Sequence, residues 1–253
     1  MTTDLLVLAR QLAEKAQQRG ILLRMLGSLA VREHGTESGA LPDLLERVPT
    51  RDIDFMGYSS QQAQTDRFFK ELGYKIDPSV AHSQEYGIQR LIYHHTEEQV
   101  MAEVFLDVLR MSHTLDFRGR LELDSPTISL VDLLLSKLQI QQITEKDIKD
   151  MISILAEHEL GSGDRERVDP GHFLKLTSDN WGLWYTALGN LRIVREWVDR
   201  VPALPPSLRA NAETRIDALI QRGESEPKTL RWRARARIGT RVRWYEEVPE
   251  VHR

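Results

Sequence analysis

The sequence predicts an α/β (α+β) protein followed by a mainly helical C-terminal region. Between residues 20 and 110, short apolar or alternating segments typical of β-strands lie between segments with the helical period of three to four residues. Beyond residue 129 only the helical period remains. The chain of 253 residues is 41% hydrophobic and 28% charged, which is ordinary for a globular protein and allows a main domain with a smaller partner.

The N-terminal part predicts a helix, a strand and a second helix. Apolar residues recur at positions 5, 8, 12 and 16, and Gly20 ends this first helix. Residues 21–26 form a short apolar strand, Gly27 and Ser28 form a tight turn, and residues 29–34 begin a second helix. The Gly-Ser pair is therefore expected at a strand-to-helix junction.

The next elements are a loop, a strand, a helix and a pair of strands. Residues 35–50 hold two glycines and two prolines and are expected to form a long loop with about one helical turn. Residues 51–56 alternate as a strand does, and residues 61–72 follow two capping serines as a helix. Residues 89–94 and 100–109 are expected to form two strands that pair across a polar turn.

Two further helices and a glycine turn are expected to complete the first domain, at residues 1–163. Their apolar positions are 130, 133, 134 and 138 in one helix and 148, 151, 152 and 155 in the next. A smaller, mainly helical region then covers residues 164–253, with a proline break at 202–206 and a basic segment at 228–243.

Composition excludes several kinds of site and protein. The chain has no cysteine, so disulfides and thiolate metal sites are excluded and a bound metal needs carboxylate or imidazole ligands. No apolar run approaches the roughly 20 residues needed to span a bilayer, and the N-terminus lacks the features of a secretion signal. We therefore expect a cytoplasmic protein with no membrane partner. The net charge of −4 argues against nonspecific nucleic-acid binding by the protein as a whole.

Two aspartates in the predicted strand 51–56 suggest a metal site. Asp52 and Asp54 are separated by one residue, so their side chains project to the same face of a strand. Two convergent carboxylates are costly unless they share a cation, and hard oxygen ligands select Mg²⁺ or Mn²⁺. The alternative interpretation is a solvated edge strand.

A third carboxylate and an anion-binding turn are the other candidate site features. Glu103 and Asp107 share one face of the predicted strand 100–109, and either completes a carboxylate triad. Alternatively, one of them faces solvent or pairs with an arginine. Gly27 and Ser28 offer N–H groups and a hydroxyl at a helix start, where phosphates bind, and a purely structural turn is the alternative there.

The order of these elements resembles the nucleotidyltransferase superfamily, which has a polymerase-beta-like fold. The superfamily motif runs hydrophobic-Gly-Ser, then Asp-hydrophobic-Asp-hydrophobic, then a hydrophobic-acid-hydrophobic strand. It stands here as residues 26–28 (LGS), 52–55 (DIDF) and 102–104 (AEV). Residues 133–138 (LLLSKL) and 145–150 (EKDIKD) are similar to the lysine helix and the Lys/Arg-Asp-x-x-Asp segment of abortive-infection-type toxin transferases.

The resemblance implies a mixed sheet flanked by helices and a metal-dependent transfer of a nucleoside monophosphate from an NTP to an acceptor. Under it, Asp52 and Asp54 hold Mg²⁺ or Mn²⁺. Glu103, or else Asp107, assists metal or base chemistry. Lys137 contacts the nucleotide phosphates. The acceptor stays open among a small molecule, tRNA and a protein, and the alternative function is a noncatalytic nucleotide-binding or toxin-antitoxin partner protein that keeps the fold.

The segment from Lys228 to Arg243 has seven basic residues and no acidic ones. Within Arg231–Arg243, arginines alternate with other residues around Trp232, which is a pattern suited to RNA phosphates and a stacked base. The alternative is a solvated face, or arginines that pair with the later acids Glu246, Glu247 and Glu250.

Overall fold

The computed structural model of the chain describes residues 4–35, 41–47, 50, 52–78, 90–95, 97, 99–162 and 166–247. These residues divide into two compact units. Unit 1 comprises the described residues within 1–33, 49–110 and 115–129, and unit 2 those within 34–48, 111–114 and 130–253. Each unit has buried apolar side chains of its own and is described separately.

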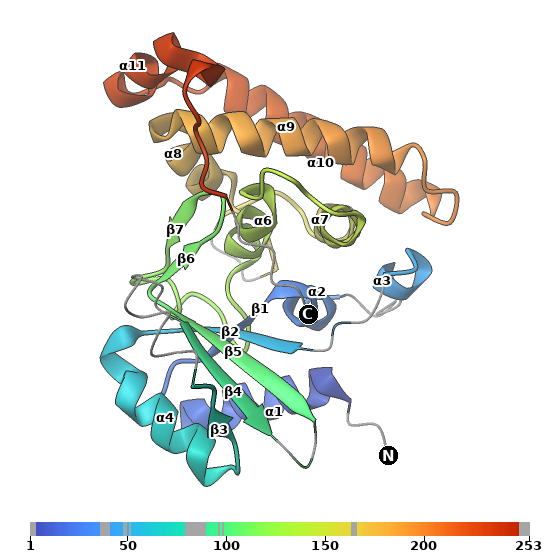
Figure 1. The fold of residues 1–253 in the computed structure, drawn as a ribbon. Helices are drawn as coiled ribbons and strands as arrows, with labels where there is room; N and C mark the ends of the chain where they lie inside the picture. The colour runs from blue at the N-terminus through green and yellow to red at the C-terminus, as the bar shows by residue number, and fades with distance from the viewer. Residues whose placement is uncertain are drawn as a thin grey trace. The chain divides into compact units, whose positions relative to one another are not determined.

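Unit 1 is built on a five-stranded mixed sheet (Figure 1). Its strands lie in the order β1 (Arg24–Leu26), β2 (Asp52–Gly57), β5 (Val100–Leu106), β4 (Arg90–His95) and β3 (Lys75–Ile76). β2 and β5 run parallel, and the other neighbours are antiparallel. The α/β class and the pairing of segment 89–94 with segment 100–109 are thereby confirmed, with Gln89 outside the described residues.

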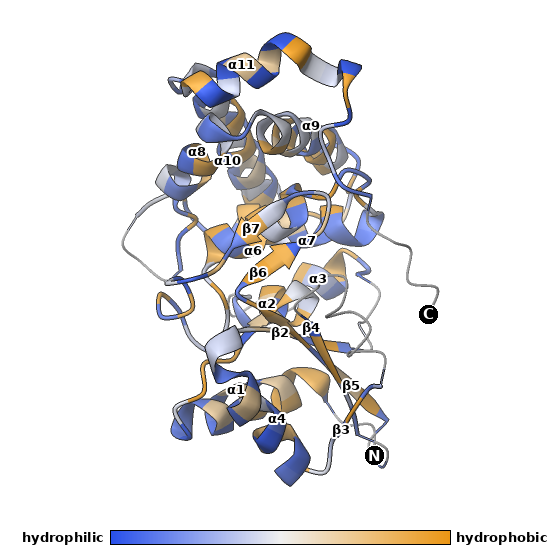
Figure 2. Ribbon diagram, turned by 60° about the vertical axis from the view of Figure 1, so that its left-hand side comes forward, coloured by the Kyte–Doolittle hydropathy of each residue, from blue (hydrophilic) through white to orange (hydrophobic). Residues whose placement is uncertain are grey.

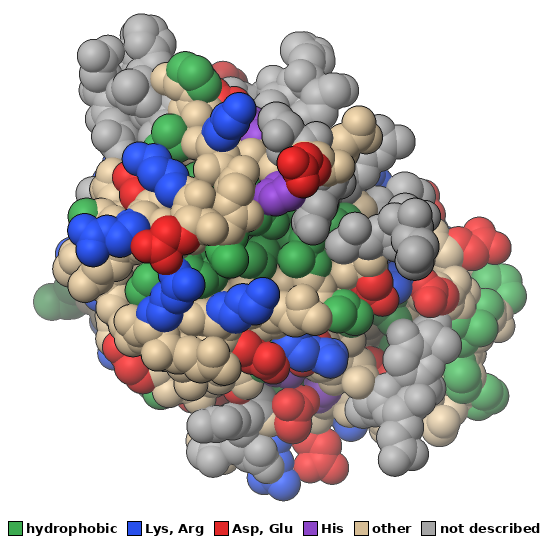
Figure 3. Space-filling model, turned by 90° about the horizontal axis from the view of Figure 1, so that it is seen from below, with side chains coloured by type: hydrophobic (Ala, Val, Ile, Leu, Met, Phe, Trp, Pro, Cys, Tyr) green, Lys and Arg blue, Asp and Glu red, His purple; other side chains and the backbone are tan. Residues whose placement is uncertain are grey.

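One face of this sheet is apolar and packs against two helices. Ile53 and Phe55 of β2 point to this face and are fully buried. The helices α1 (Leu5–Gln18) and α4 (Gln62–Glu71) cover it (Figure 1). Phe69 of α4 stacks on Tyr93 of β4 with ring centroids 4.2 Å apart. Figure 3 shows this side from outside, where charged side chains surround a central area of hydrophobic ones.

The other face carries the polar side chains of β2 and β5. Strand period puts Asp52 and Asp54 on it, opposite to Ile53 and Phe55. The helix α2 (Gly27–Glu33) begins directly after β1, at Gly27 instead of at residue 29. Asp52 and Asp54 therefore lie on the face opposite to the one that packs against α1 and α4, next to Met56 of the same strand, which is buried.

The predicted strand 100–109 is interrupted at Asp107. β5 ends at Leu106, and β6 (Val108–Arg110) pairs with β7 (Thr114–Asp116) in a separate two-stranded sheet. Asp107 has a φ of 60°, a left-handed conformation that aspartate tolerates better than most residues. A continuous apolar run does not reveal such a corner, so the expected single strand is wrong at this end.

Unit 2 is mainly helical, as predicted for the C-terminal region. Its helices are α3 (Leu41–Leu44), α6 (Leu130–Leu138), α7 (Glu145–Glu157), α8 (Pro170–Asp179), α9 (Trp181–Val198), α10 (Pro206–Ser225) and α11 (Leu230–Ile238). Thr144 and Asp147 form a capping box at the start of α7. Among the residues that the structure describes, no helix is long and apolar enough to cross a membrane.

The boundary between the two units lies earlier in the chain than residue 163, the boundary expected from sequence, because residues from Leu130 onward belong to unit 2. α6 and α7 belong to unit 2 because they are joined to its later helices. The amide of Asn190 on α9 donates to the carbonyl of Leu138 at 2.9 Å, and the guanidinium of Arg215 on α10 donates to that of Leu155 at 2.9 Å. The glycine turn therefore lies inside unit 2, with Gly163 outside the described residues.

Candidate active site

The carboxylates of β2 and β5 share one face of the sheet. In the parallel pairing of these strands, Asp54 is the register partner of Glu103, and Asp52 is the partner of Met101. Asp52 and Asp54 are half-buried, whereas Glu103 is buried at 4% exposure. Register partners on adjacent strands point to the same side and lie about 5 Å apart. The structure therefore brings three of the four predicted acids to one face.

Gly27 lies directly against this carboxylate face. Leu26 is the register partner of Asp54 on the antiparallel strand β1, so the turn that follows Leu26 is next to Asp54. Gly27 has a φ of +72°, and a Cβ built on it would lie 2.8 Å from Oδ2 of Asp54. Glycine is therefore required there both by its conformation and by the space that the carboxylate occupies. Ser28 follows in the first turn of α2 and is half-buried.

Glu103 forms an ion pair that the sequence did not reveal. Nη1 of Arg90, on the neighbouring strand β4, lies 3.0 Å from Oε1 of Glu103. Burial raises the pKa of the Glu103 carboxyl, and Arg90, which lowers it, offsets this only in part. The Nε of Arg90 is buried and has no hydrogen-bond partner among the described residues. The sequence showed only that a strand with a basic residue was expected to pair with a strand that holds acidic residues. It did not show the register of the two strands, which decides whether Arg90 reaches Glu103.

Asp107 lies away from the other three acids. It follows the last residue of β5, four positions beyond Glu103, and its own backbone N–H donates to the carbonyl of Gly57. Its carboxylate accepts hydrogen bonds from the N–H of Ser59, at 3.0 Å, and from the Ser59 hydroxyl. These bonds fix the start of the 3₁₀ turn Ser59–Gln61 that precedes α4. The Asp107 carboxylate thus stabilises the turn at Ser59. It does not lie on the sheet face that carries Asp52, Asp54 and Glu103.

The donor set on this face suits a hard divalent cation in part. Asp52 and Asp54 supply carboxylate oxygens, the ligand type that such a cation prefers, and a side chain at residue 27 would crowd Oδ2 of Asp54. Among the described residues, no group of three or more acids and histidines has the spacing of a formed metal site. Asp52 and Asp54 therefore offer two carboxylates on one side of the sheet, while Glu103 is held by Arg90.

Lys137 belongs to an ion-pair cluster inside unit 2. Its Nζ lies 3.0 Å from Oδ1 of Asp147 and 2.9 Å from Oδ2 of Asp150, both on α7. Nε of Arg47 lies 3.0 Å from Oδ1 of Asp150. Burial lowers the pKa of the Lys137 ammonium, but Asp150 and Asp147 raise it by more, so its pKa lies above the ordinary value. The Asp-x-x-Asp segment of residues 147–150 therefore holds the lysine of the preceding helix.

The arginine cluster is helical, which changes how its side chains are distributed. In the helix α11, successive residues turn by 100°, so Arg231 and Arg235 share one side while Arg233 and Arg237 lie on the other. Figure 2 shows hydrophilic and hydrophobic residues alternating along this helix. The alternative pairing with later acids holds for one arginine, since Nη2 of Arg243 lies 2.9 Å from Oε1 of Glu247. Glu250 lies outside the described residues.

Comparison with protein-family models found no match to this chain, and comparison with curated proteins also found none. Among solved structures, the chain is similar to the antibiotic-resistance factor ANT(2'')-Ia, a nucleotidyltransferase studied in solution. The likeness covers 60% of this chain and 84% of that one, at 12% identity and a TM-score of 0.37.

Proposed function

We propose that unit 1 is a metal-dependent nucleotidyltransferase that moves a nucleoside monophosphate from an NTP to an acceptor. The observation that carries the proposal is the contact of the Gly27 backbone with Asp54, on a sheet face that also bears Asp52 and Glu103. It supports the proposal because such strand-to-helix turns receive phosphate and neighbouring carboxylates hold a divalent cation.

Each residue of the face has a part in this proposal. Asp52 and Asp54 hold the cation, and the Gly27 backbone and the Ser28 hydroxyl receive a phosphate of the NTP. A bound Mg²⁺ or Mn²⁺ would neutralise and align the triphosphate. An acceptor oxygen attacks the α-phosphorus, and the bond to pyrophosphate breaks, so that pyrophosphate leaves with that electron pair. Glu103 either completes the cation site or takes the proton of the acceptor.

One observation favours a second function, a noncatalytic nucleotide-binding protein that keeps this fold. Arg90 holds Glu103 in an ion pair with an N–O distance of 3.0 Å. An arginine on the third carboxylate supplies positive charge without a metal, and it opposes the reorientation that a full triad requires. The two functions differ in product formation, because both allow an NTP to bind.

Calorimetric titration with NTP in the presence of Mn²⁺ tests the proposal. Replacing both Asp52→Asn and Asp54→Asn should weaken metal-dependent NTP binding at least tenfold, because the two anionic ligands are lost together. Asp116→Asn is the control, since Asp116 is an exposed acid of unit 1 that pairs with Arg118. Equal binding by the wild type and the double variant would refute the cation site.

Product analysis then separates the two functions. Wild-type protein with Mn²⁺, each labelled NTP, and pools of small molecules, tRNA or protein should release pyrophosphate and label one acceptor class. Tight NTP binding with no pyrophosphate in any pool would favour the noncatalytic function.

A further inference from the structure

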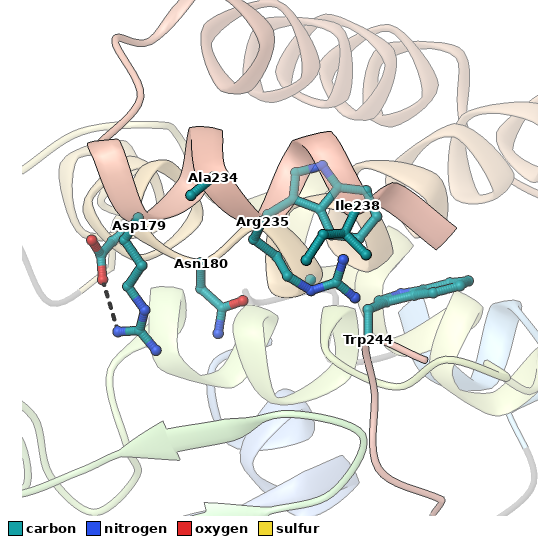
Figure 4. A pocket seen from close by; sticks show the side chains of 9 residues that line it. Asp179, Asn180, Ala234, Arg235, Ile238 and Trp244 are labelled. Carbon is teal, nitrogen blue, oxygen red and sulfur yellow. Dashed lines mark hydrogen bonds and ion pairs between the residues drawn. The ribbon is translucent and has the colours of Figure 1, made fainter. Parts of the chain in front are cut away.

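A cavity in unit 2 is lined by none of the residues of the proposed active site. It has a volume of about 450 Å³ and is formed by the start of α9, one side of α11 and the segment that follows α11. Figure 4 shows Asn180, Arg235, Ile238 and Trp244 around it. Cavities of this size, roughly 300 to 1,000 Å³, are typical of small-molecule sites.

Arg235 places a fixed positive charge on the wall of this cavity. Its Nη1 donates to the carbonyl of Gly239 at 2.7 Å, and its Nη2 donates to that of Val242 at 2.8 Å. Carbonyl acceptors orient the guanidinium without cancelling its charge. No carboxylate among the described residues forms an ion pair with Arg235. The cavity therefore has an oriented cation whose charge remains available to a ligand.

Aromatic rings support this cation and extend the flat wall. The guanidinium carbon of Arg235 lies 4.8 Å from the ring centroid of Trp181, and the ring of Trp181 also stacks on that of Tyr185 with centroids 5.1 Å apart. Trp244 meets Trp181 edge-on at 6.2 Å. The Arg235 guanidinium and the ring of Trp244 line the cavity and offer flat surfaces to a planar ligand.

Arg231 adds a second cation at the rim of the cavity. Its side chain is 78% exposed, and its Nη1 lies 3.5 Å from Oδ2 of Asp179 (Figure 4). Two arginines and one aspartate leave the cavity with a net positive charge in a protein whose net charge is −4. The lining therefore combines a stacking surface, excess positive charge, and amide and carboxylate groups at Asn180 and Asp179 that can hydrogen-bond a ring edge.

We propose that this cavity is a second nucleotide-binding site. The base stacks on the Arg235 guanidinium and Trp244, and a phosphate lies beside Arg231. An apolar ligand would leave the Arg235 charge uncompensated, and an anion without a ring would leave the stacking surfaces empty. The nucleotide is either free or part of a single-stranded RNA, which offers the same base and phosphate. The inference does not depend on the proposed function of unit 1.

Binding in EDTA tests the site separately from the metal-dependent one. Protein in about 50 mM salt is titrated by calorimetry with the four nucleoside monophosphates and, in a second arm, with short single-stranded RNA. We expect saturable binding in at least one arm, with quenching of tryptophan fluorescence because the base stacks in the cavity. Free nucleotide alone identifies a small-molecule site, and RNA alone identifies a strand-binding site. Asp52→Asn combined with Asp54→Asn should leave this binding unchanged.

A filling substitution locates the ligand in the cavity. Ala234 lines the cavity from α11, so Ala234→Phe should occupy it and weaken binding at least tenfold without removing a charge or a hydrogen bond. Ala210→Phe is the matched control, because Ala210 is an exposed alanine of α10 that does not line the cavity. The proposal is overturned if neither arm binds, or if the two phenylalanine variants bind equally well.

A charge substitution tests the phosphate position. Arg231→Gln should weaken nucleotide binding threefold to tenfold and leave binding of the matching nucleoside unchanged. Arg200→Gln is the control, since Arg200 is likewise exposed and pairs with the carboxylate of Glu196, four residues earlier in the chain. Equal losses for nucleotide and nucleoside would overturn the phosphate assignment. Binding to anionic lipid vesicles without binding to nucleotide or RNA would replace the proposal by a membrane-surface function for α11.

Discussion

The two acids of the predicted strand 100–109 differ in what they contact, although they look alike in sequence. Glu103 is the register partner of Asp54 and faces Arg90, whereas Asp107 holds the backbone of Ser59. The sequence places both on one face of a strand, because it does not show where the strand ends. The contacts therefore favour Glu103 as the third carboxylate, which is a choice that mutation can test.

We expect Glu103→Gln and Asp107→Asn to fail in different ways. Glu103→Gln should weaken Mn²⁺-dependent NTP binding about tenfold or more and abolish turnover, because a ligand is lost. Asp107→Asn should retain binding and lower the free energy of unfolding by about 1 kcal/mol, because Asn keeps one acceptor for Ser59 and tolerates a positive φ. Calorimetry and urea denaturation measure the two effects. An active Glu103→Gln beside a well-folded but inactive Asp107→Asn would reverse the assignment.

The buried His113 should make stability depend on pH. Burial lowers the pKa of the His113 imidazole to about 4, and its Nε2 lies 2.9 Å from Oγ1 of Thr186. The imidazole is neutral in the folded protein and has a pKa of about 6.5 when unfolded. The contribution of His113 to the free energy of unfolding is therefore complete above pH 6.5. It decreases as the pH falls towards 4, by up to about 3 kcal/mol.

Urea denaturation between pH 7 and pH 4 measures this effect. His113→Gln should flatten the stability curve in this window, because glutamine does not titrate and can still donate to Thr186. His94→Gln is the control, since His94 is 44% exposed. Part of the slope should remain in both variants, because burial also lowers the pKa of His158. Equal slopes for wild type and His113→Gln would show that His113 does not titrate in this range.

The helices α6 and α7 are joined by the ion pairs of Lys137. Lys137→Met should lower the free energy of unfolding by about 3 kcal/mol, because Asp147 loses its cation while Asp150 still faces Arg47. Lys149→Met is the matched control on α7, with an expected loss below about 1 kcal/mol, because its partner Glu145 is 58% exposed. Adding Asp147→Asn to Lys137→Met should recover part of the loss.

NTP binding by the same variants decides between two roles for Lys137. If the lysine holds the two helices together, binding should fall only as far as folding does, and the Asp147→Asn addition should restore both. A Lys137→Met protein as stable as Lys149→Met, yet unable to bind NTP, would instead support the phosphate contact that the family resemblance implies.

Elements were readable from sequence where a local pattern specifies them. The period-two pattern predicts β2, and the helical period predicts α1, α6 and α7. Three features depend on contacts between distant segments and were not readable. These are the corner at Asp107, the Arg90 pair with Glu103, and the packing of α6 and α7 with α9 and α10. An apolar helix face indicates that this face is buried, but it does not show which other element packs against it.

α11 shows the same limit for a polar element. Alternating arginines are compatible with one face of a strand or with two sides of a helix, and the segment has no apolar period that decides between them. In the structure Thr229 caps a helix, and no residue of α11 is buried. The helix separates arginines that a strand would have aligned on one face. Arg235 donates hydrogen bonds to the carbonyls of Gly239 and Val242, in the segment that follows the helix.

For the whole molecule, charge is distributed unevenly. The net charge is −4, and the seven basic residues between Lys228 and Arg243 leave −11 on the rest of the chain. A polyanion is therefore repelled by most of the protein and attracted by one segment. Such binding should be weak in total and steeply dependent on salt, because the local contacts displace counterions from each phosphate.

The salt dependence of RNA binding tests whether α11 makes these contacts. Arg231, Arg233 and Arg237 are exposed, so changing all three to Gln should leave the Arg235 bonds intact and reduce the slope of log K against log salt by about 2, at roughly 0.7 for each phosphate contact to a single strand. The control changes the exposed Arg192, Arg200 and Arg222 to Gln. Both triple variants alter the net charge by the same amount, so general repulsion is matched and only local contacts differ. Equal slopes in the two variants would mean that RNA responds to the net charge of the molecule and that α11 is not its binding surface.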